Sequence, residues 1–333
     1  MRILHTADLH YGHSRFLPAG AHIERQQRMS REICSLVQAH HIDVVILAGD
    51  IAHRIDLSPE EEYIMVEFLR DLDDLVPWVA IAGNHDRYGK DKTRIDFLTQ
   101  VKFKQGTIAT SQPSWVLHRD VKFILVPYAG HSTESLENAV HKVIATSKPA
   151  ATTIVVAHEH FEGAVLDSGY VGHSQGYPRI PRIPEVDYWA LGDIHLHQAV
   201  TVGAWYSGAP IQHTFGEKLP KGVIVLDLTT KEMEFVELTT PSKLITLDAA
   251  PEIWDEANYY RIVGEAQVIK QGSPSLIYTD FSRKVEVKLD PEKVISQISD
   301  VLLTVGLPKE LLEEAVEIHE DAFKKVSGGT WTS

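Results

Sequence analysis

Residues that can bind metal ions stand directly after several short apolar runs of this chain. The run MRILHTADLH ends with Asp8 and His10, and the run IDVVILAGD ends with Asp50. The run VPWVAIAGNHD ends in the same way with Asn84 and His85. Short runs rich in leucine and β-branched residues predict buried parallel strands. In α/β folds the loops after such strands form the sites, so we expect these side chains to share one metal centre.

Two later apolar runs repeat the pattern. TTIVVAHEH ends with His158 and His160, and VDYWALGDIHLH ends with Asp193, His195 and His197. Chance would scatter such residues over loops and helices as well. The concentration of donors at strand ends therefore favours a single site in an α/β fold.

The donor types indicate which ions would bind. Asp, Asn and His without Cys suit divalent cations of intermediate hardness, so manganese, iron(II), magnesium and zinc all fit, whereas a tetrahedral thiolate zinc site does not. There are too many donors for one ion. Two ions about 3.5–4 Å apart could together clamp a phosphate and activate a water molecule. Asp50 is the natural bridge between them, His85 is placed to protonate a leaving oxygen, and His53 could contact a phosphate oxygen.

The remaining pattern supplies the elements that would hold these residues. Helical periodicity predicts amphipathic helices over about 22–39, from the Ser58 N-cap to about Leu75, and in ESLENAVHKVIATS. GVIVLDLT and EMEFVELTT predict a hairpin that closes the first domain, and Pro241 marks its boundary. Beyond it, KLITLD, YYRIV and KVEVKLD are strand-like, and a last amphipathic helix follows.

Composition narrows the class of protein. At 333 residues the chain is long enough for about two domains, and 44% hydrophobic with 23% charged residues is ordinary for a globular protein. The single cysteine, Cys34, excludes an internal disulfide framework and fits a reducing compartment. No apolar stretch approaches the ~18 residues of a membrane span, and the N-terminus has no signal-peptide shape. We therefore expect a cytoplasmic protein with no membrane segment.

Charge bears on the substrate. The net charge of −14 argues against broad, non-specific binding of nucleic acid, although bound dications would offset part of it. The segment RYGKDKTR places Arg87, Lys90, Lys92 and Arg94 directly after the third run. It is either a solvated loop or a contact for a DNA phosphate backbone.

Taken together, these motifs resemble the calcineurin-like metallophosphoesterase family. Its blocks DxH, GDxx, GNH[DE], a lone His and GHxH correspond in order to Asp8-Leu9-His10, Gly49-Asp50, Gly83-Asn84-His85-Asp86, His158 and Gly192-Asp193-Ile194-His195. MRILHTADLHYG, AGDIAH, ALGDIH and YSGAPIQHTFGE further resemble the SbcD/Mre11 nuclease branch. The resemblance implies a four-layer αββα sandwich with a small C-terminal α+β cap domain. It predicts a nuclease domain over 1–240, a DNA-binding cap over 241–305 and an ATPase-binding helix over 306–333.

The resemblance also implies roles for individual residues. His85 would be the catalytic histidine and His53 a contact for the substrate phosphate. The first metal would be held by Asp8, His10, Asp50 and His195, and the second by Asp50, Asn84, His158 and Asp193.

One position departs from the family pattern. The last motif usually begins with His, and Asp193 stands there. Aspartate can bind manganese or magnesium, so we expect a working but altered second site, and His197 is the alternative ligand if its loop bends. His160 competes with His158, and the strand end favours His158.

The implied function is that of a Mn²⁺-dependent exonuclease and endonuclease subunit acting on DNA ends or hairpins, with Mg²⁺ or Fe²⁺ as alternative cofactors. Its partners would be DNA, a coiled-coil ABC-type ATPase of the SbcC/Rad50 class and a second copy of the chain, joined through the helices near 22–39 and 59–75. Two alternatives stay open. One is another phosphoesterase of this fold that acts on nucleotides, phosphoproteins or lipids, and the other is a non-catalytic scaffold.

Overall fold

The computed structural model describes residues 1–263 and 276–280, except residues 16, 19, 90, 173–175, 250 and 252. The described residues belong to the first of two compact units, Met1–Phe281. The predicted helix over 306–333 and much of the predicted cap domain lie outside the described residues. The predicted domain boundaries therefore stay predictions.

The first six-stranded sheet carries the earliest motifs. Its order is β12-β11-β1-β2-β3-β4, and β1 to β4 run parallel. The predicted hairpin is confirmed, since β11 and β12 pair antiparallel and β11 also pairs antiparallel with β1. The strands are β1 (Arg2–Thr6), β2 (Val44–Leu47), β3 (Trp78–Ile81), β4 (Gly106–Ala109), β11 (Gly222–Asp227) and β12 (Glu232–Glu237).

The second six-stranded sheet carries the later motifs. Its order is β5-β6-β7-β8-β10-β9, with β6, β7, β8 and β10 parallel and the two edge strands antiparallel to their neighbours. The strands are β5 (Ser114–His118), β6 (Val121–Val126), β7 (Thr152–His158), β8 (Tyr188–Gly192), β9 (Gln198–Thr201) and β10 (Ala204–Tyr206).

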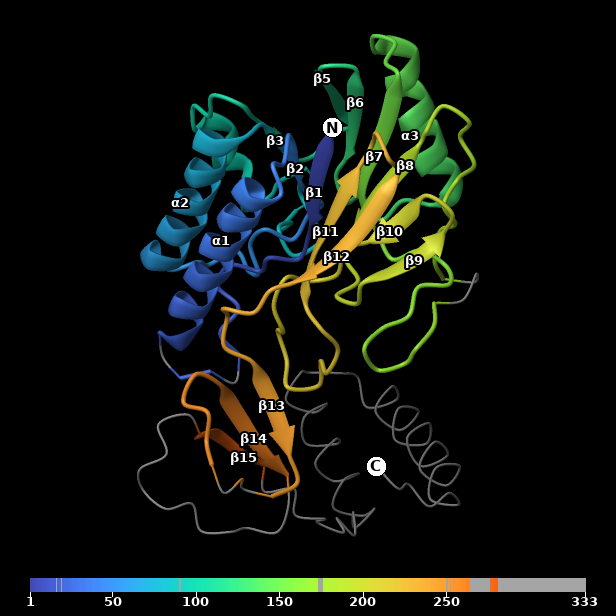
Figure 1. The fold of residues 1–333 in the computed structure, drawn as a ribbon. Helices are drawn as coiled ribbons and strands as arrows, with labels where there is room; N and C mark the ends of the chain where they lie inside the picture. The colour runs from blue at the N-terminus through green and yellow to red at the C-terminus, as the bar shows by residue number, and fades with distance from the viewer. Residues whose placement is uncertain are drawn as a thin grey trace, which may run out of the picture. The chain divides into compact units, whose positions relative to one another are not determined.

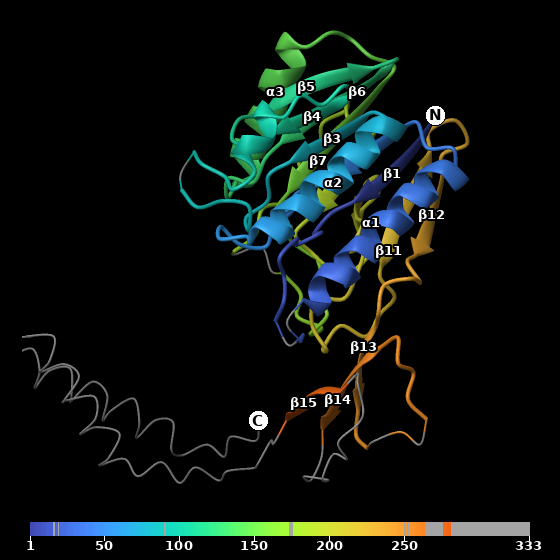
Figure 2. The same cartoon turned by 90° about the vertical axis from the view of Figure 1, so that its left-hand side faces the viewer.

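The two sheets pack face to face and are covered on their outer faces (Figures 1 and 2). Ile3 and Ile46 of the first sheet pack with Phe123 and Val156 of the second in one apolar core. α1 (Ala21–Ala39) and α2 (Pro59–Leu75) cover the first sheet, and α3 (Thr133–Thr146) with the loop after β7 covers the second. Both faces of the central strands are thus buried, which explains their continuous apolar runs. The α/β fold with four αββα layers is confirmed.

The second helix begins where its sequence predicts. The Ser58 hydroxyl accepts a hydrogen bond from the Glu61 N–H, and the Glu61 carboxylate accepts one from the Ser58 N–H. Pro59 occupies the first helical position, where its missing N–H costs nothing. This capping box fixes the residue at which α2 begins, and so the residue at which the loop after β2 ends.

Several short elements were not predicted. These are β4, β5, β9, β10, β15 (Leu276–Asp280) and a 3₁₀ helix, η1 (Asp96–Gln100). KLITLD and YYRIV do form β13 (Leu244–Leu247) and β14 (Tyr259–Val263), which pair in parallel with β15 as a third sheet. KVEVKLD lies outside the described residues.

Candidate metal centre

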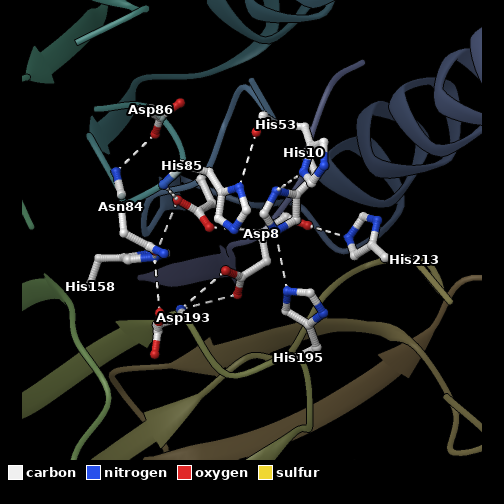
Figure 3. Close-up of polar contacts among 12 residues, drawn as sticks. Asp8, His10, His53, Asn84, His85, Asp86, His158, Asp193, His195 and His213 are labelled. Carbon is white, nitrogen blue, oxygen red and sulfur yellow. Dashed lines mark hydrogen bonds and ion pairs between the residues drawn. The ribbon is translucent and has the colours of Figure 1, made fainter. Parts of the chain in front are cut away.

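The site residues sit on tight turns at the ends of the strands. Asp8, His10, Asp50 and Asp193 all have positive φ values, of 55°, 48°, 50° and 98°. Such values are uncommon for residues other than glycine and are strained. The turns aim the side chains that follow β1, β2 and β8 at one place, and the ends of β3 and β7 supply the rest of the cluster (Figure 3).

One half of the cluster is made by residues from β1, β2 and β8. The Nε2 atom of His10 lies 3.2 Å from Nε2 of His195 and 3.5 Å from Oδ2 of Asp50. Ligand atoms of Asp8, His10 and Asp50 all lie within 4.8 Å of one another, and all three residues are buried. Burial lowers the pKa of His10 well below its usual range, which keeps this imidazole in the neutral form that binds metals.

The other half surrounds His158 at the end of β7. Its Nε2 atom lies 2.9 Å from Asn84 Oδ1, 3.4 Å from Asp50 Oδ1 and 3.8 Å from Asp193 Oδ1. Its Nδ1 atom lies 2.7 Å from the Ala48 carbonyl oxygen. Burial alone would lower the pKa of His158, but the Asp50 carboxylate raises it well above its usual range. A carbonyl behind Nδ1 orients the ring so that Nε2 faces the site.

Asp50 links the two halves. Its Oδ2 atom faces His10, whereas its Oδ1 atom faces His158 and accepts a 2.9 Å hydrogen bond from the backbone N–H of His85. One carboxylate with an oxygen toward each half is the geometry that a bridging ligand needs. A Cβ on Gly83 would come 2.1 Å from Oδ1, so the GNHD turn requires glycine to approach Asp50 this closely.

The residues present fit divalent cations. Burial raises the pKa of Asp8 to about 6, and its carboxylate oxygens accept hydrogen bonds from the Asp193 N–H at 3.1 and 3.3 Å. Buried carboxylates are costly unless they are paired or bind a metal. The imidazole nitrogens of His10 also face other imidazole nitrogens, His195 Nε2 and His53 Nδ1, both at 3.2 Å. A cluster of carboxylates and imidazoles is chemically a cation site.

His85 and His53 form the exposed edge of the cluster. The His85 ring is exposed, and its Nδ1 atom lies 3.0 Å from the His53 carbonyl oxygen. The two rings stack with centroids 4.9 Å apart. Since the carbonyl occupies Nδ1, the Nε2 atom of His85 is the one available for proton transfer.

The structure separates the two candidates for the altered second site. Asp193 joins the cluster, with Oδ1 toward His158 and Oδ2 3.9 Å from His160 Nδ1. His197 instead stacks against Trp205 and Phe235, with ring centroids 5.4 and 4.4 Å away. The ring of His160 lies against Tyr177, at a centroid distance of 3.9 Å.

Three buried residues of the site were given no role from the sequence. The Asp86 carboxylate accepts hydrogen bonds from the backbone N–H groups of Gly83, Ile51 and Ala52, and so ties the loop after β3 to the loop after β2. His213 lies 2.9 Å from the Asp8 carbonyl oxygen, and Glu217 lies 3.3 Å from His195 Nδ1. The last residue of the GNHD motif and the block HTFGE were the available signals, but neither predicts which distant atom is contacted.

The basic loop after β3 is partly used for structure. Arg94 forms a 2.8 Å ion pair with Glu62, and the Arg87 guanidinium donates to the Tyr128 carbonyl. Lys92 is exposed, and Lys90 lies outside the described residues.

Among the residues that the structure describes, no helix has the length and apolar composition needed to cross a bilayer.

The match to a known family covers the whole cluster of predicted ligands. Residues 1–197, more than half of the chain, match the calcineurin-like phosphoesterase family, and the chain belongs to it. Proteins of this family bind divalent metals, and membership supports a metal-dependent hydrolase. The suspected resemblance to the family is thereby confirmed.

Relatives extend the likeness beyond the family domain. The chain is 23% identical to the SbcD subunit of nuclease SbcCD from Bacillus subtilis, over 98% of this chain and 92% of that protein. It is 25% identical to the DNA double-strand break repair protein Mre11 of Methanopyrus kandleri, over 81% of this chain and 64% of that protein. It is also 25% identical to a provisionally named phosphoesterase, 078R, of Invertebrate iridescent virus 3, over 62% of this chain and 58% of that protein. The chain thus spans less than two thirds of the viral and archaeal proteins.

Proposed function

We propose that this chain is the nuclease subunit of a cytoplasmic complex similar to SbcCD or Mre11–Rad50. It would hydrolyse phosphodiester bonds at DNA ends or hairpins with two divalent ions, and we propose Mn²⁺ in preference to Mg²⁺ or Fe²⁺. The observation that carries the proposal is the convergence of carboxylates, imidazoles and one amide from five separate strand ends, with Asp50 facing both halves.

The proposed roles follow the two halves of the cluster. Asp8, His10 and His195 would hold one ion, and Asn84, His158 and Asp193 the other, with Asp50 between them. When bound, such a pair of ions polarises a phosphoryl oxygen and supplies a nucleophile at neutral pH.

His85 would protonate the leaving oxygen. Its Nδ1–H donates to the His53 carbonyl, which leaves Nε2 as the ring nitrogen that could serve the substrate. A phosphodiester that enters the site from solvent would meet this exposed residue at the edge of the cluster. His53 lies beside it, and we propose that it contacts a phosphate oxygen.

DNA is preferred to a small substrate for two reasons. The alignment with the SbcD subunit of a nuclease runs through 98% of this chain and so includes the part after the family domain. Lys92 is also an exposed cation close to the site in sequence. Arg87 and Arg94 are weaker evidence for DNA binding than the sequence suggested, because both side chains have partners within the protein. The proposed partners are DNA, an SbcC/Rad50-like ATPase and a second copy of the chain.

Two other functions compete with this one. A phosphoesterase acting on nucleotides or phosphoproteins would use the same cluster, and the name of the viral relative favours it. A non-catalytic scaffold would have no need of a buried donor set this complete.

The deciding experiment is a cleavage assay. The purified full-length chain is incubated with labelled duplex and hairpin DNA and, separately, with a small phosphodiester, in Mn²⁺, Mg²⁺ or chelator, with and without a candidate ATPase. Cleavage of DNA that needs the metal supports the proposal. Hydrolysis of the small diester without DNA cleavage favours the alternative phosphoesterase, and no hydrolysis with no bound metal favours the scaffold.

A further inference from the structure

A buried ionic cluster lies beside the proposed metal centre, in the loop between β10 and β11. Glu217 and Lys221 are the charged residues of this loop that are buried, with exposed fractions of 5% and 7%. Neither is a proposed metal ligand. Burying a carboxylate and an ammonium is unfavourable unless their hydrogen bonds are well made, so the pair calls for a physical explanation.

Both oxygens of Glu217 accept hydrogen bonds from groups of the site. Its Oε1 atom lies 3.3 Å from Nδ1 of His195. Its Oε2 atom accepts from the backbone N–H of His213 at 3.2 Å and lies 3.0 Å from the Lys221 ammonium. His213 in turn lies 2.9 Å from the carbonyl oxygen of Asp8. The carboxylate therefore contacts one proposed ligand and, through His213, the backbone of another.

Lys221 completes the arrangement. Its ammonium donates a 2.7 Å hydrogen bond to the carbonyl oxygen of His195 and lies 3.4 Å from a carboxylate oxygen of Asp167. His195 is thus held at two points, its ring by Glu217 and its backbone by Lys221. Hydrogen bonds to both the ring and the backbone of His195 define the direction of its ring better than packing alone.

We propose that Glu217 is a positioning residue for the first metal ion. As the acceptor at Nδ1 it fixes the tautomer of His195 that carries its proton on Nδ1, so that the lone pair is on Nε2, the atom that lies 3.2 Å from His10 Nε2. Carboxylates behind metal-binding histidines act in this way in general. The inference rests on the metal centre proposed above and adds the residue that orients one of its ligands.

The position requires a carboxylate in particular. Oε1 faces an N–H donor on His195, and Oε2 faces donors on both His213 and Lys221. Glutamine would have to turn its NH₂ group toward one of these donors, whichever way the amide is flipped. Glu217→Gln therefore removes the second acceptor while keeping the size and shape of the side chain.

The test is a calorimetric titration of the metal-free, full-length protein with Mn²⁺ alone. We expect Glu217→Gln to weaken one of two binding events by roughly 10–100-fold, the usual effect of losing such a partner. Asp73→Asn is the matched control, because Asp73 is equally buried and accepts hydrogen bonds from the backbone of Lys104 and Gly106 at the start of β4. It should lower stability without changing the affinity for Mn²⁺.

A second readout separates orientation from general loosening. In ¹⁵N NMR spectra of the metal-free protein, His195 should carry its proton on Nδ1, and this tautomer should be lost in Glu217→Gln. If Glu217→Gln does not fold, Lys221→Met serves instead, since it keeps Glu217 but removes the hydrogen bond to the His195 carbonyl. It should weaken the same binding event.

The outcomes distinguish this inference from the proposed function. Unchanged Mn²⁺ affinity in Glu217→Gln, or an equal loss in Asp73→Asn, would overturn the positioning role and leave the metal centre standing. A wild-type protein that binds no Mn²⁺ would overturn the metal centre itself.

Discussion

The histidines and aspartates of the site differ in role according to what lies behind them. His158 has the Ala48 carbonyl behind its ring and His195 has Glu217, whereas His85 has the His53 carbonyl and an exposed outer edge. The first two arrangements suit metal ligands, which must present one fixed lone pair. The third suits a proton donor, which must reach the substrate.

The role of His85 can be tested directly. His85→Asn should keep both metal ions but slow hydrolysis of a small phosphodiester by roughly 10²–10⁴-fold, the usual contribution of a positioned acid. Metal content is measured by elemental analysis and hydrolysis by product absorbance, with wild type as the reference. Loss of a metal ion from this variant would show instead that His85 is a ligand.

The altered second site gives a paired prediction. Asp193→Ala should reduce the number of bound Mn²⁺ ions from two to one, because Oδ1 of Asp193 lies 3.8 Å from Nε2 of His158, in the half of the cluster proposed to hold the second ion. His197→Ala should leave two ions bound, since that ring lies against Trp205 and Phe235. Both numbers come from titration followed by elemental analysis. Two ions in Asp193→Ala together with a loss in His197→Ala would reverse the assignment.

At the scale of elements, the site depends on the ends of parallel strands from two different sheets. β1, β2 and β3 deliver Asp8, Asp50 and Asn84, and the second sheet delivers His158 and His195. Contacts such as His158 with the Ala48 carbonyl and the Asp193 N–H with Asp8 join the two edges. Any change in how the sheets pack would therefore move one half of the site relative to the other.

His5 of β1 is a buried polar link between the sheets, and it makes stability depend on pH. Its Nδ1 atom lies 3.2 Å from the Tyr188 hydroxyl and its Nε2 atom 3.2 Å from the Leu191 carbonyl, both on β8. Burial lowers the pKa of His5 from 6.5 to about 3. The unfolded chain therefore binds the proton more readily than the folded one below pH 6.5, and stability falls as the pH falls toward 3.

The size of this effect can be measured. Lowering the pH from 7 to 5 should reduce the free energy of unfolding by about 2 kcal/mol through His5, because each unit of pKa difference corresponds to about 1.4 kcal/mol. Urea unfolding of metal-free wild type and His5→Gln at both pH values gives the comparison. His5→Gln should be less stable at pH 7 and lose about 2 kcal/mol less on acidification. An equal loss in both proteins would contradict the assignment.

At the scale of the whole molecule, the described residues include every residue of the proposed metal centre but not the segment that we propose binds the ATPase. Residues 308–333 lie outside the described residues, and the proposal that they bind the ATPase comes from resemblance alone. Deleting them should abolish binding of a candidate SbcC/Rad50-like ATPase and leave hydrolysis of a small phosphodiester unchanged, because no site residue lies there. Co-purification measures the first and product absorbance the second. Retained ATPase binding would move the contact elsewhere.

The sequence by itself determined the strands and their terminal donors. β1, β2, β3, β7 and β8 were predicted because strands buried on both faces must be apolar, so the first polar residue marks the end of each strand. The start of α2 was predicted for an equally local reason, since Ser58, Pro59 and Glu61 lie within one turn. These features need no knowledge of distant contacts.

Only the tertiary structure decided which polar residues face the site. Asp193 and His197 are four positions apart on the same loop, yet one faces His158 and the other an aromatic pair. The sequence suggested that Arg94 could contact DNA, but its side chain pairs with Glu62 of α2. Glu217 has its proposed role only because the loop between β10 and β11 places it beside His195. Each of these outcomes depends on residues far apart in the chain, and a pattern of neighbours along the sequence carries no information on such contacts.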